Sequence, residues 1–195
     1  MLKLGILGSG RGTNFVAIYN NIMSCSLPAT IEVVISDKKS KMLDFAEEKK
    51  LKNFYIDPNE YKSREEYDKQ IAKILEECKV DLVILAGYMR ILSADFIKTF
   101  SERILNIHPS LLPSFKGLYP QRQALSAGVK YAGCTVHVVT EALDSGQIID
   151  QESVEVFAVD DEESLSARIL EKEHLLYSRA IKYYAQKRNL LPKEK

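Results

Sequence analysis

Hydrophobic positions in the first fifty residues fall into short continuous runs and one helical stripe. Residues 2–7 form an apolar run that ends at Gly8, and a stripe at helical spacing follows at Phe15, Ile18, Tyr19 and Ile22. Residues 31–35 are a second apolar run, and residues 40–50 form a charged segment that we expect to be helical. This order predicts strand, glycine-rich loop, helix, strand and helix.

The middle of the chain continues the alternation of strands and helices. The spacing of Ser63 and Glu66 is typical of a capping box, and the helix that it opens has apolar positions at Tyr67, Ile71, Ile74, Leu75 and Cys78. Residues 80–86 and 104–107 are almost continuously apolar, as in parallel strands that helices cover on both faces. The pattern predicts a doubly wound, Rossmann-like α/β fold with a mainly parallel sheet.

After His108 the pattern changes from alternation to consecutive strands. A proline-punctuated loop and a short helical stretch at residues 122–127 precede two predicted strands at 134–140 and 148–157. Strands that follow each other without a helix are typical of an antiparallel hairpin, so we expect an antiparallel C-terminal strand pair. A final helix is predicted to begin at the acidic run 160–163.

Composition narrows the class of protein. The 195 residues include 27 basic and 27 acidic side chains, so no net charge favours binding to nucleic acid or to an anionic membrane surface. The three cysteines form no C-x-x-C pair, and the three histidines form no H-E-x-x-H motif. No apolar run is long enough to span a membrane. We therefore expect one cytoplasmic domain, residues 1–195, without a metal.

The loop from Gly8 to Asn14 is a candidate phosphate site. Glycines at a helix start expose backbone N–H groups, and the helix dipole with Gly12, Thr13 and Asn14 can complete an anion site. The alternative is a plain tight turn. The dinucleotide fingerprint fails because Thr13 replaces its last glycine, although Asp37 leaves a nicotinamide cofactor formally open. We expect a phosphate monoester to bind here.

Asn106 and His108 are candidate catalytic residues at the end of a predicted strand. They are two positions apart, so both side chains emerge on one face, at the edge where α/β sheets bind ligands. Asn106 offers an amide donor to an oxyanion, and His108 offers a group that titrates near neutrality. Asp144, in loop 141–146, can pair with His108 and keep it protonated. Each residue alone has an ordinary structural alternative, but the combination favours direct addition to a carbonyl.

Glu173 puts a carboxylate within the apolar stripe of the final helix. A buried carboxylate needs a partner, which is either a ligand amine or hydroxyl or a structural arginine. His174 lies on the adjoining stripe and is interpreted as a packed structural residue. His137, inside the predicted strand 134–140, is interpreted as a core or pocket-wall residue.

Three segments resemble the folate-dependent formyltransferases. They are LAGYMRILS at residues 85–93, LNIHPSLLP at 105–113 and EALDSGQ at 141–147. Residues 10–14 and the Glu173–His174 pair extend the resemblance over almost the whole chain. It implies the formyltransferase fold and transfer of the formyl group of 10-formyltetrahydrofolate to the amine of phosphoribosylglycinamide, in purine biosynthesis.

The resemblance also implies roles for individual residues. Asn106, His108 and Asp144 are the implied catalytic trio, and Glu173 contacts the ribonucleotide whose phosphate the glycine loop holds. The implied folate contacts are Arg64, Met89, Arg90, Ile91, Leu92, Asn106 and Thr140. The N-terminal half of the chain thus binds the ribonucleotide, and the C-terminal half is catalytic and binds the folate. In this family the Leu112–Pro113 bond is expected to be cis.

Tyr119 and Gln121 depart from the family, whose members commonly have histidines at these positions, and this difference bears on a detail of the proton relay. Two alternatives stay open: a related formyltransferase with another amine acceptor, and a non-catalytic nucleotide-binding α/β module. We expect small-molecule substrates as partners, and a monomer or homodimer.

Overall fold

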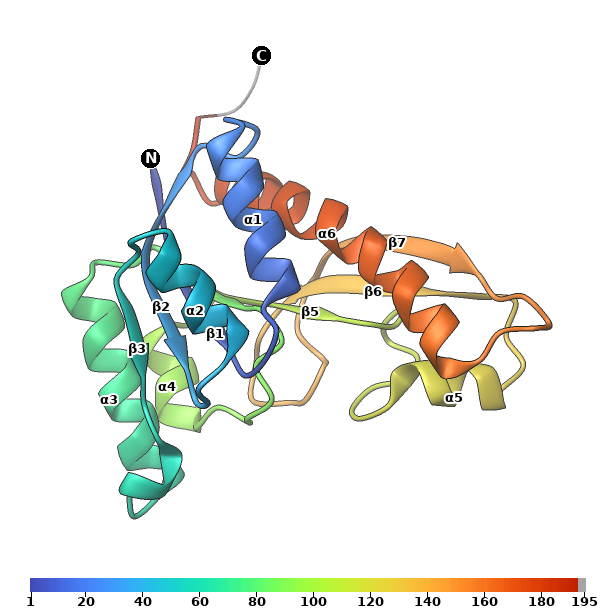
Figure 1. The fold of residues 1–195 in the computed structure, drawn as a ribbon, viewed down its shortest axis with the longest axis horizontal. Helices are drawn as coiled ribbons and strands as arrows, with labels where there is room; N and C mark the ends of the chain where they lie inside the picture. Colours follow the sequence, from blue (N-terminus) through green and yellow to red (C-terminus); the bar gives the residue numbers. More distant parts are fainter. Residues whose placement is uncertain (193–195) are drawn as a thin grey trace.

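The computed structural model describes residues 1–192 and contains a seven-stranded sheet between layers of helices (Figure 1). The last three residues of the predicted domain, 193–195, lie outside the described residues. The strands are β1 (Leu2–Gly8), β2 (Ala29–Ser36), β3 (Asn53–Tyr55), β4 (Leu82–Leu85), β5 (Ile104–His108), β6 (Tyr131–Val138) and β7 (Ile148–Glu155). Their order across the sheet is β3-β2-β1-β4-β5-β6-β7.

The first five strands are parallel, whereas β6 runs antiparallel to β5 and β7 runs antiparallel to β6. Both the mainly parallel sheet and the antiparallel C-terminal pair of the sequence prediction are therefore confirmed. The chain reverses its direction of travel across the sheet between β1 and β4. In such folds the carboxyl ends of the strands beside this reversal form the ligand crevice.

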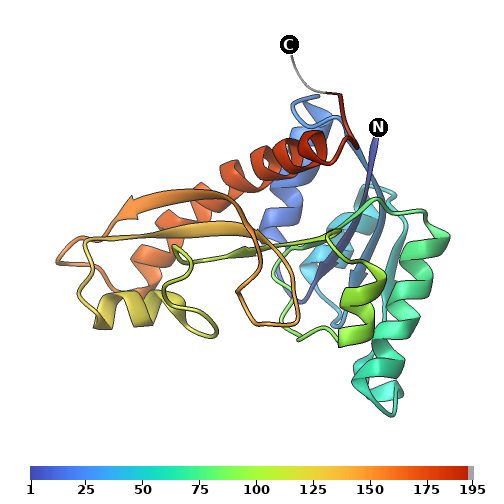
Figure 2. The ribbon, with the colours of Figure 1, turned by 180° about the vertical axis from the view of Figure 1, so that it is seen from behind.

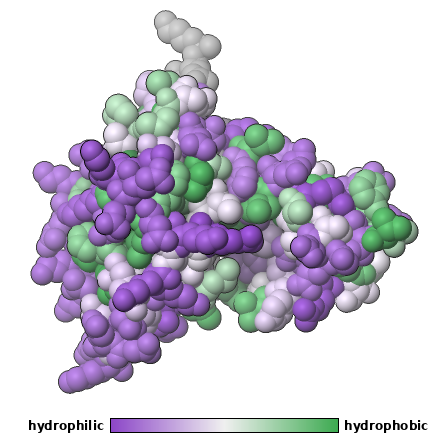
Figure 3. Space-filling view, viewed as in Figure 1, coloured by the Kyte–Doolittle hydropathy of each residue, from purple (hydrophilic) through white to green (hydrophobic). Residues whose placement is uncertain are grey.

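Helices cover both faces of the sheet (Figures 1 and 2). On one face lie α1 (Thr13–Met23), α2 (Lys41–Glu48) and the long α6 (Glu162–Lys187), and on the other lie α3 (Arg64–Glu77) and α4 (Ala94–Thr99). The short α5 (Pro120–Ser126) packs beside the start of α6, where Arg122 Nε donates to Glu162 Oε2 at 2.9 Å. On the side of the molecule that carries α1, α2 and α6, hydrophilic side chains cover most of the surface (Figure 3).

The sheet separates two hydrophobic cores. Successive strand residues point to opposite faces, so Ile6 joins the core under α1 and α6, and Leu7 joins the core under α3 and α4. Gly5 lies where α3 approaches β1, and a Cβ there would come within 2.5 Å of the Leu75 side chain. Two-sided burial explains why the central strands are nearly continuous apolar runs in the sequence.

Several boundaries differ from the sequence prediction. The strand predicted at 134–140 begins three residues earlier and ends at Val138, so Thr140 belongs to the following loop. The structure adds β3, a 3-10 turn η1 (Pro58–Glu60) and α4, which are too short to give a periodic signal. Ser63 caps α3 as predicted, but the Glu66 carboxylate accepts from the N–H of Lys62 and not from that of Ser63.

Tyr177 of α6 joins the helix to the middle of the sheet. Its hydroxyl lies within hydrogen-bond distance of two backbone carbonyls, those of Leu85 on β4 (3.0 Å) and Leu105 on β5 (2.8 Å), and its side chain is fully buried. It therefore fixes α6 against β4 and β5, and β4 is one of the strands that border the crevice.

Replacement of Tyr177 by Phe should destabilise the protein by about 1–3 kcal/mol, because it removes the donor from two buried carbonyls. Urea unfolding monitored by circular dichroism measures this loss. Tyr183→Phe is the matched control, since Tyr183 is 53% exposed, and it should change stability by less than about 0.5 kcal/mol. Equal effects of the two substitutions would contradict the proposed anchoring role.

Candidate active site

The glycine loop leads directly into the N-terminus of α1. Gly12 is the N-cap and has φ of 70°, and a Cβ at this position would lie 2.8 Å from the Met42 side chain. Both the backbone conformation and the close approach of α2 therefore require glycine. The N–H groups in the first turn of a helix have no partner within the helix, and they give this end a partial positive charge.

Asn14 and Glu173, predicted separately as substrate contacts, meet directly. The Nδ2 of Asn14 donates to Glu173 Oε2 at 2.7 Å, and both side chains are buried. The partner of the helix carboxylate is thus an amide, and not the arginine that was one of the two sequence-based options. Burial raises the pKa of Glu173 to about 7, while the hydrogen bond from Asn14 acts in the opposite direction.

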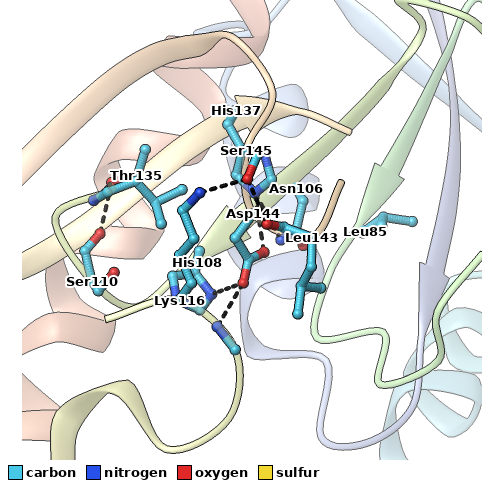
Figure 4. Close-up of polar contacts among 12 residues, drawn as sticks. Leu85, Asn106, His108, Ser110, Lys116, Thr135, His137, Leu143, Asp144 and Ser145 are labelled. Atoms are coloured by element: carbon cyan, nitrogen blue, oxygen red, sulfur yellow. Dashed lines mark hydrogen bonds and ion pairs between the residues drawn. The ribbon is translucent and has the colours of Figure 1, made fainter. Parts of the chain in front are cut away.

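Asn106, His108 and Asp144 lie together at the carboxyl end of β5 (Figure 4). The Nδ1 of His108 is 3.5 Å from Asp144 Oδ2, and its Nε2 is 2.9 Å from the carbonyl oxygen of Phe115. Both ring nitrogens thus face oxygens that only accept hydrogen bonds, so a doubly protonated ring fits this environment. The proximity of His108 and Asp144 that the sequence predicted is confirmed.

Asp144 also ties together the two loops beside His108. Its Oδ2 accepts from the N–H of Gly117 at 2.9 Å, and the adjacent Ser145 hydroxyl is 2.5 Å from Lys116 Nζ. Asp144 has φ of 46°, the left-handed region that Asp tolerates better than most residues. The loop conformation therefore depends on the same carboxylate that pairs with His108.

His137 belongs to this cluster, although its sequence context indicated only a core or pocket-wall residue. It is 2% exposed. Its Nε2 is 3.2 Å from Asn106 Nδ2 and 3.7 Å from Asp144 Oδ1. The signal that would have found it is the antiparallel register, which pairs Asn106 with His137 and His108 with Thr135.

The predicted folate contacts other than Asn106 lie on three segments. Met89 and Ile91 are 73% and 64% exposed, whereas Leu92 is buried in the core under α3 and α4. Arg90 lies over the Tyr67 ring at 5.0 Å and borders a cavity of about 400 Å³. The other two residues are exposed: Arg64 pairs with Glu65 at 3.4 Å, and the Thr140 hydroxyl donates to the Ala142 carbonyl.

Other sequence-based expectations concern the loop before α5 and the remaining histidine. The Leu112–Pro113 bond is cis, as the family resemblance implied. Tyr119 is exposed and is the left-handed N-cap of α5, and its ring lies under the Arg122 guanidinium at 4.9 Å. His174 is partly buried, and its Nε2 is a buried atom without a hydrogen-bond partner among residues 1–192.

Within residues 1–192, no group of three or more His, Cys, Asp and Glu side chains is arranged to hold a metal ion. In the same range, no helix has the length and hydropathy to cross a membrane.

Residues 2–181 match the formyl transferase family. The chain belongs to this family. This match confirms the resemblance seen in the sequence. The members of the formyl transferase family are group-transfer enzymes. Similarity extends to a phosphoribosylglycinamide formyltransferase of Escherichia coli (strain K12), which is 37% identical over 96% of this chain and 89% of its own length.

Two further relatives show how far the likeness extends. The crystal structure of glycinamide ribonucleotide transformylase 1 from Symbiobacterium toebii superposes with a TM-score of 0.94 at 46% identity, and the match covers 96% of this chain and 89% of that one. The trifunctional purine biosynthetic protein adenosine-3 of Gallus gallus is 44% identical over 94% of this chain. The match spans only 18% of the length of that relative.

Glu173→Gln should remove a pH dependence of stability. The folded pKa of Glu173 is about 7, raised from 4.5. The folded protein therefore binds this proton more tightly than the unfolded chain. As pH rises from about 4.5 to about 7, the wild type loses stability relative to the variant. Melting temperatures at about pH 5 and about pH 8 test this: the variant should gain several degrees on the wild type at the higher pH. A constant difference would contradict the raised pKa.

Proposed function

We propose that this protein transfers the formyl group of 10-formyltetrahydrofolate to the amine of phosphoribosylglycinamide, a step of purine biosynthesis. The cluster at the carboxyl end of β5 carries the proposal: His108 contacts Asp144, and His137 contacts both Asp144 and Asn106. The names of the relatives that match nearly full length support the same substrates. Formyl folate is the co-substrate, and no metal takes part.

The chemistry follows from the donors and acceptors of this cluster. The glycinamide amine attacks the formyl carbon and forms a C–N bond, giving a tetrahedral intermediate whose oxygen carries negative charge. Asn106 donates an N–H to this oxyanion, and protonated His108 stabilises it. The intermediate collapses as the bond from the formyl carbon to the folate nitrogen breaks. That nitrogen takes up a proton, the attacking amine has lost one, and tetrahydrofolate leaves.

Asp144 keeps His108 charged in this mechanism. A carboxylate 3.5 Å from the imidazole favours the protonated ring electrostatically, and the Phe115 carbonyl accepts from the second ring nitrogen. Because no nucleophilic side chain is needed, transfer is direct and no covalent enzyme intermediate forms.

The remaining site residues bind the two substrates. Backbone N–H groups at Gly12, with Thr13 and Asn14, hold the ribonucleotide phosphate, and Glu173 contacts the same substrate. The folate contacts are Arg64, Met89, Arg90, Ile91, Leu92, Asn106 and Thr140. The exposed Met89 and Ile91 side chains provide apolar surface for the planar pteridine ring.

The proposal extends to the organisation of the protein. Residues 1–195 act as one domain. The N-terminal half supplies the phosphate loop and the folate contacts up to Leu92, and the C-terminal half supplies the catalytic residues, the remaining folate contacts and Glu173. The protein works in the cytoplasm as a monomer or homodimer on small-molecule substrates, without nucleic acid or membrane.

Asp144→Asn should lower kcat on the order of a hundredfold at neutral pH, because His108 loses the charge that stabilises its protonated form. The side-chain oxygen of Asn can still accept from Gly117, so the loop should keep its conformation. Steady-state assays with both substrates measure the change. Unaltered kcat in a correctly folded Asp144→Asn enzyme would exclude the assigned role.

The double substitution Thr13→Ala with Asn14→Ala should raise KM for the ribonucleotide on the order of tenfold or more, because charge-assisted contacts to the phosphate are lost. KM for the folate should change little and is the internal control. If both constants rise equally, the phosphate assignment is wrong.

The identity of the amine acceptor is tested in the same assay, by competition between phosphoribosylglycinamide and other phosphorylated amines.

A further inference from the structure

His137 is held in one protonation state by its surroundings. The Nδ1 of His137 is 3.0 Å from the carbonyl oxygen of Val138, which only accepts, so Nδ1 must be the protonated nitrogen of a neutral ring. Burial lowers the pKa of His137 and outweighs the hydrogen bond to the Val138 carbonyl and the charge of Asp144, which both raise it; His108 and Lys116 lower it further. The ring is therefore neutral near pH 7, and its Nε2 presents a lone pair.

The lone pair on Nε2 determines the orientation of the Asn106 amide. Nε2 is 3.2 Å from Asn106 Nδ2, so the amide donates one of its two N–H groups to the ring. With the amide turned over, its oxygen would face the lone pair and the contact would be repulsive. Because Nε2 is also only 3.7 Å from Asp144 Oδ1, the N–H end of the amide is held on the side of the His108–Asp144 pair.

We propose that His137 is a positioning residue for formyl transfer, which accepts a hydrogen bond from Asn106 and thereby keeps the second amide N–H directed to the oxyanion. A turned amide would bring a carbonyl oxygen to a developing negative charge. This inference rests on the proposed function, since it needs an oxyanion beside Asn106. The neighbouring β5–β6 pairing makes the arrangement rigid, because Asn106 and His137 are direct partners in the sheet register.

The protonation of His137 can be measured without any activity. In ¹⁵N NMR spectra of the full-length protein, the His137 ring should show a protonated Nδ1 and an unprotonated Nε2 near pH 7. A His137→Gln spectrum assigns the signals. A protonated Nε2, in either the neutral or the charged ring, would overturn the proposal. An enzyme inactive on phosphoribosylglycinamide would instead refute the proposed function and leave this result unchanged.

Two substitutions at this position separate positioning from packing. His137→Gln reaches the position of Nε2 with an oxygen that can accept from Asn106, whereas His137→Asn reaches only the position of Nδ1. We expect His137→Gln to keep kcat within a few fold. His137→Asn should lower kcat on the order of tenfold or more with little change in either KM. Equal kcat values in the two variants would overturn the proposal.

A double-mutant cycle gives a second readout. Asn106→Ala should cost on the order of a hundredfold in kcat in the wild type. In the His137→Asn background it should cost only a few fold, because the amide has already lost its orientation. Fully additive costs would mean that the two residues act independently. Melting temperatures identify any variant that is misfolded, and in that case the tautomer measurement alone decides.

Discussion

The antiparallel pairing of β5 with β6 is the constraint on which the rest of the site depends. In this register Asn106 lies opposite His137, and His108 lies opposite Thr135. Residues two apart on a strand share a face, so one pairing aligns all four polar side chains on one side of the sheet. A slip of one residue would exchange them for the apolar side chains between them. The polar cluster and the core are thus specified by the same hydrogen bonds.

Thr135 transmits this register to the loop after β5. Its hydroxyl donates to the Ser110 carbonyl at 2.6 Å and accepts from the Leu112 N–H at 3.0 Å, and Gln151 of β7 donates to it at 2.9 Å. Thr135 is fully buried, so its hydroxyl has no water as an alternative partner. The start of the loop that passes His108 is therefore fixed by the antiparallel strands.

The sequence was sufficient to predict a residue's role where that role depends on residues close to it along the chain. Continuous apolar runs predicted the parallel strands, and spacing alone aligned Glu173 with the buried positions of α6. It was insufficient where a role depends on pairing between distant segments. His137 is 31 residues from Asn106, and nothing local to either residue indicates their contact. The same holds for Asn14 and Glu173, which are 159 positions apart.

Two of the buried polar atoms of residues 1–192 that have no protein partner belong to residues predicted to contact a ligand. The buried side-chain atoms of residues 1–192 without a hydrogen-bond partner include Asn14 Oδ1 and Arg90 Nε. Folded proteins satisfy nearly all buried polar groups, so such atoms need a partner from outside the chain. Asn14 uses one N–H of its Nδ2 on Glu173, which leaves the other N–H for the phosphate and the oxygen to accept from a substrate hydroxyl or amine. The buried pair thus orients the amide of Asn14 for substrate, as His137 orients that of Asn106: in each case an internal hydrogen bond orients the group that meets the ligand.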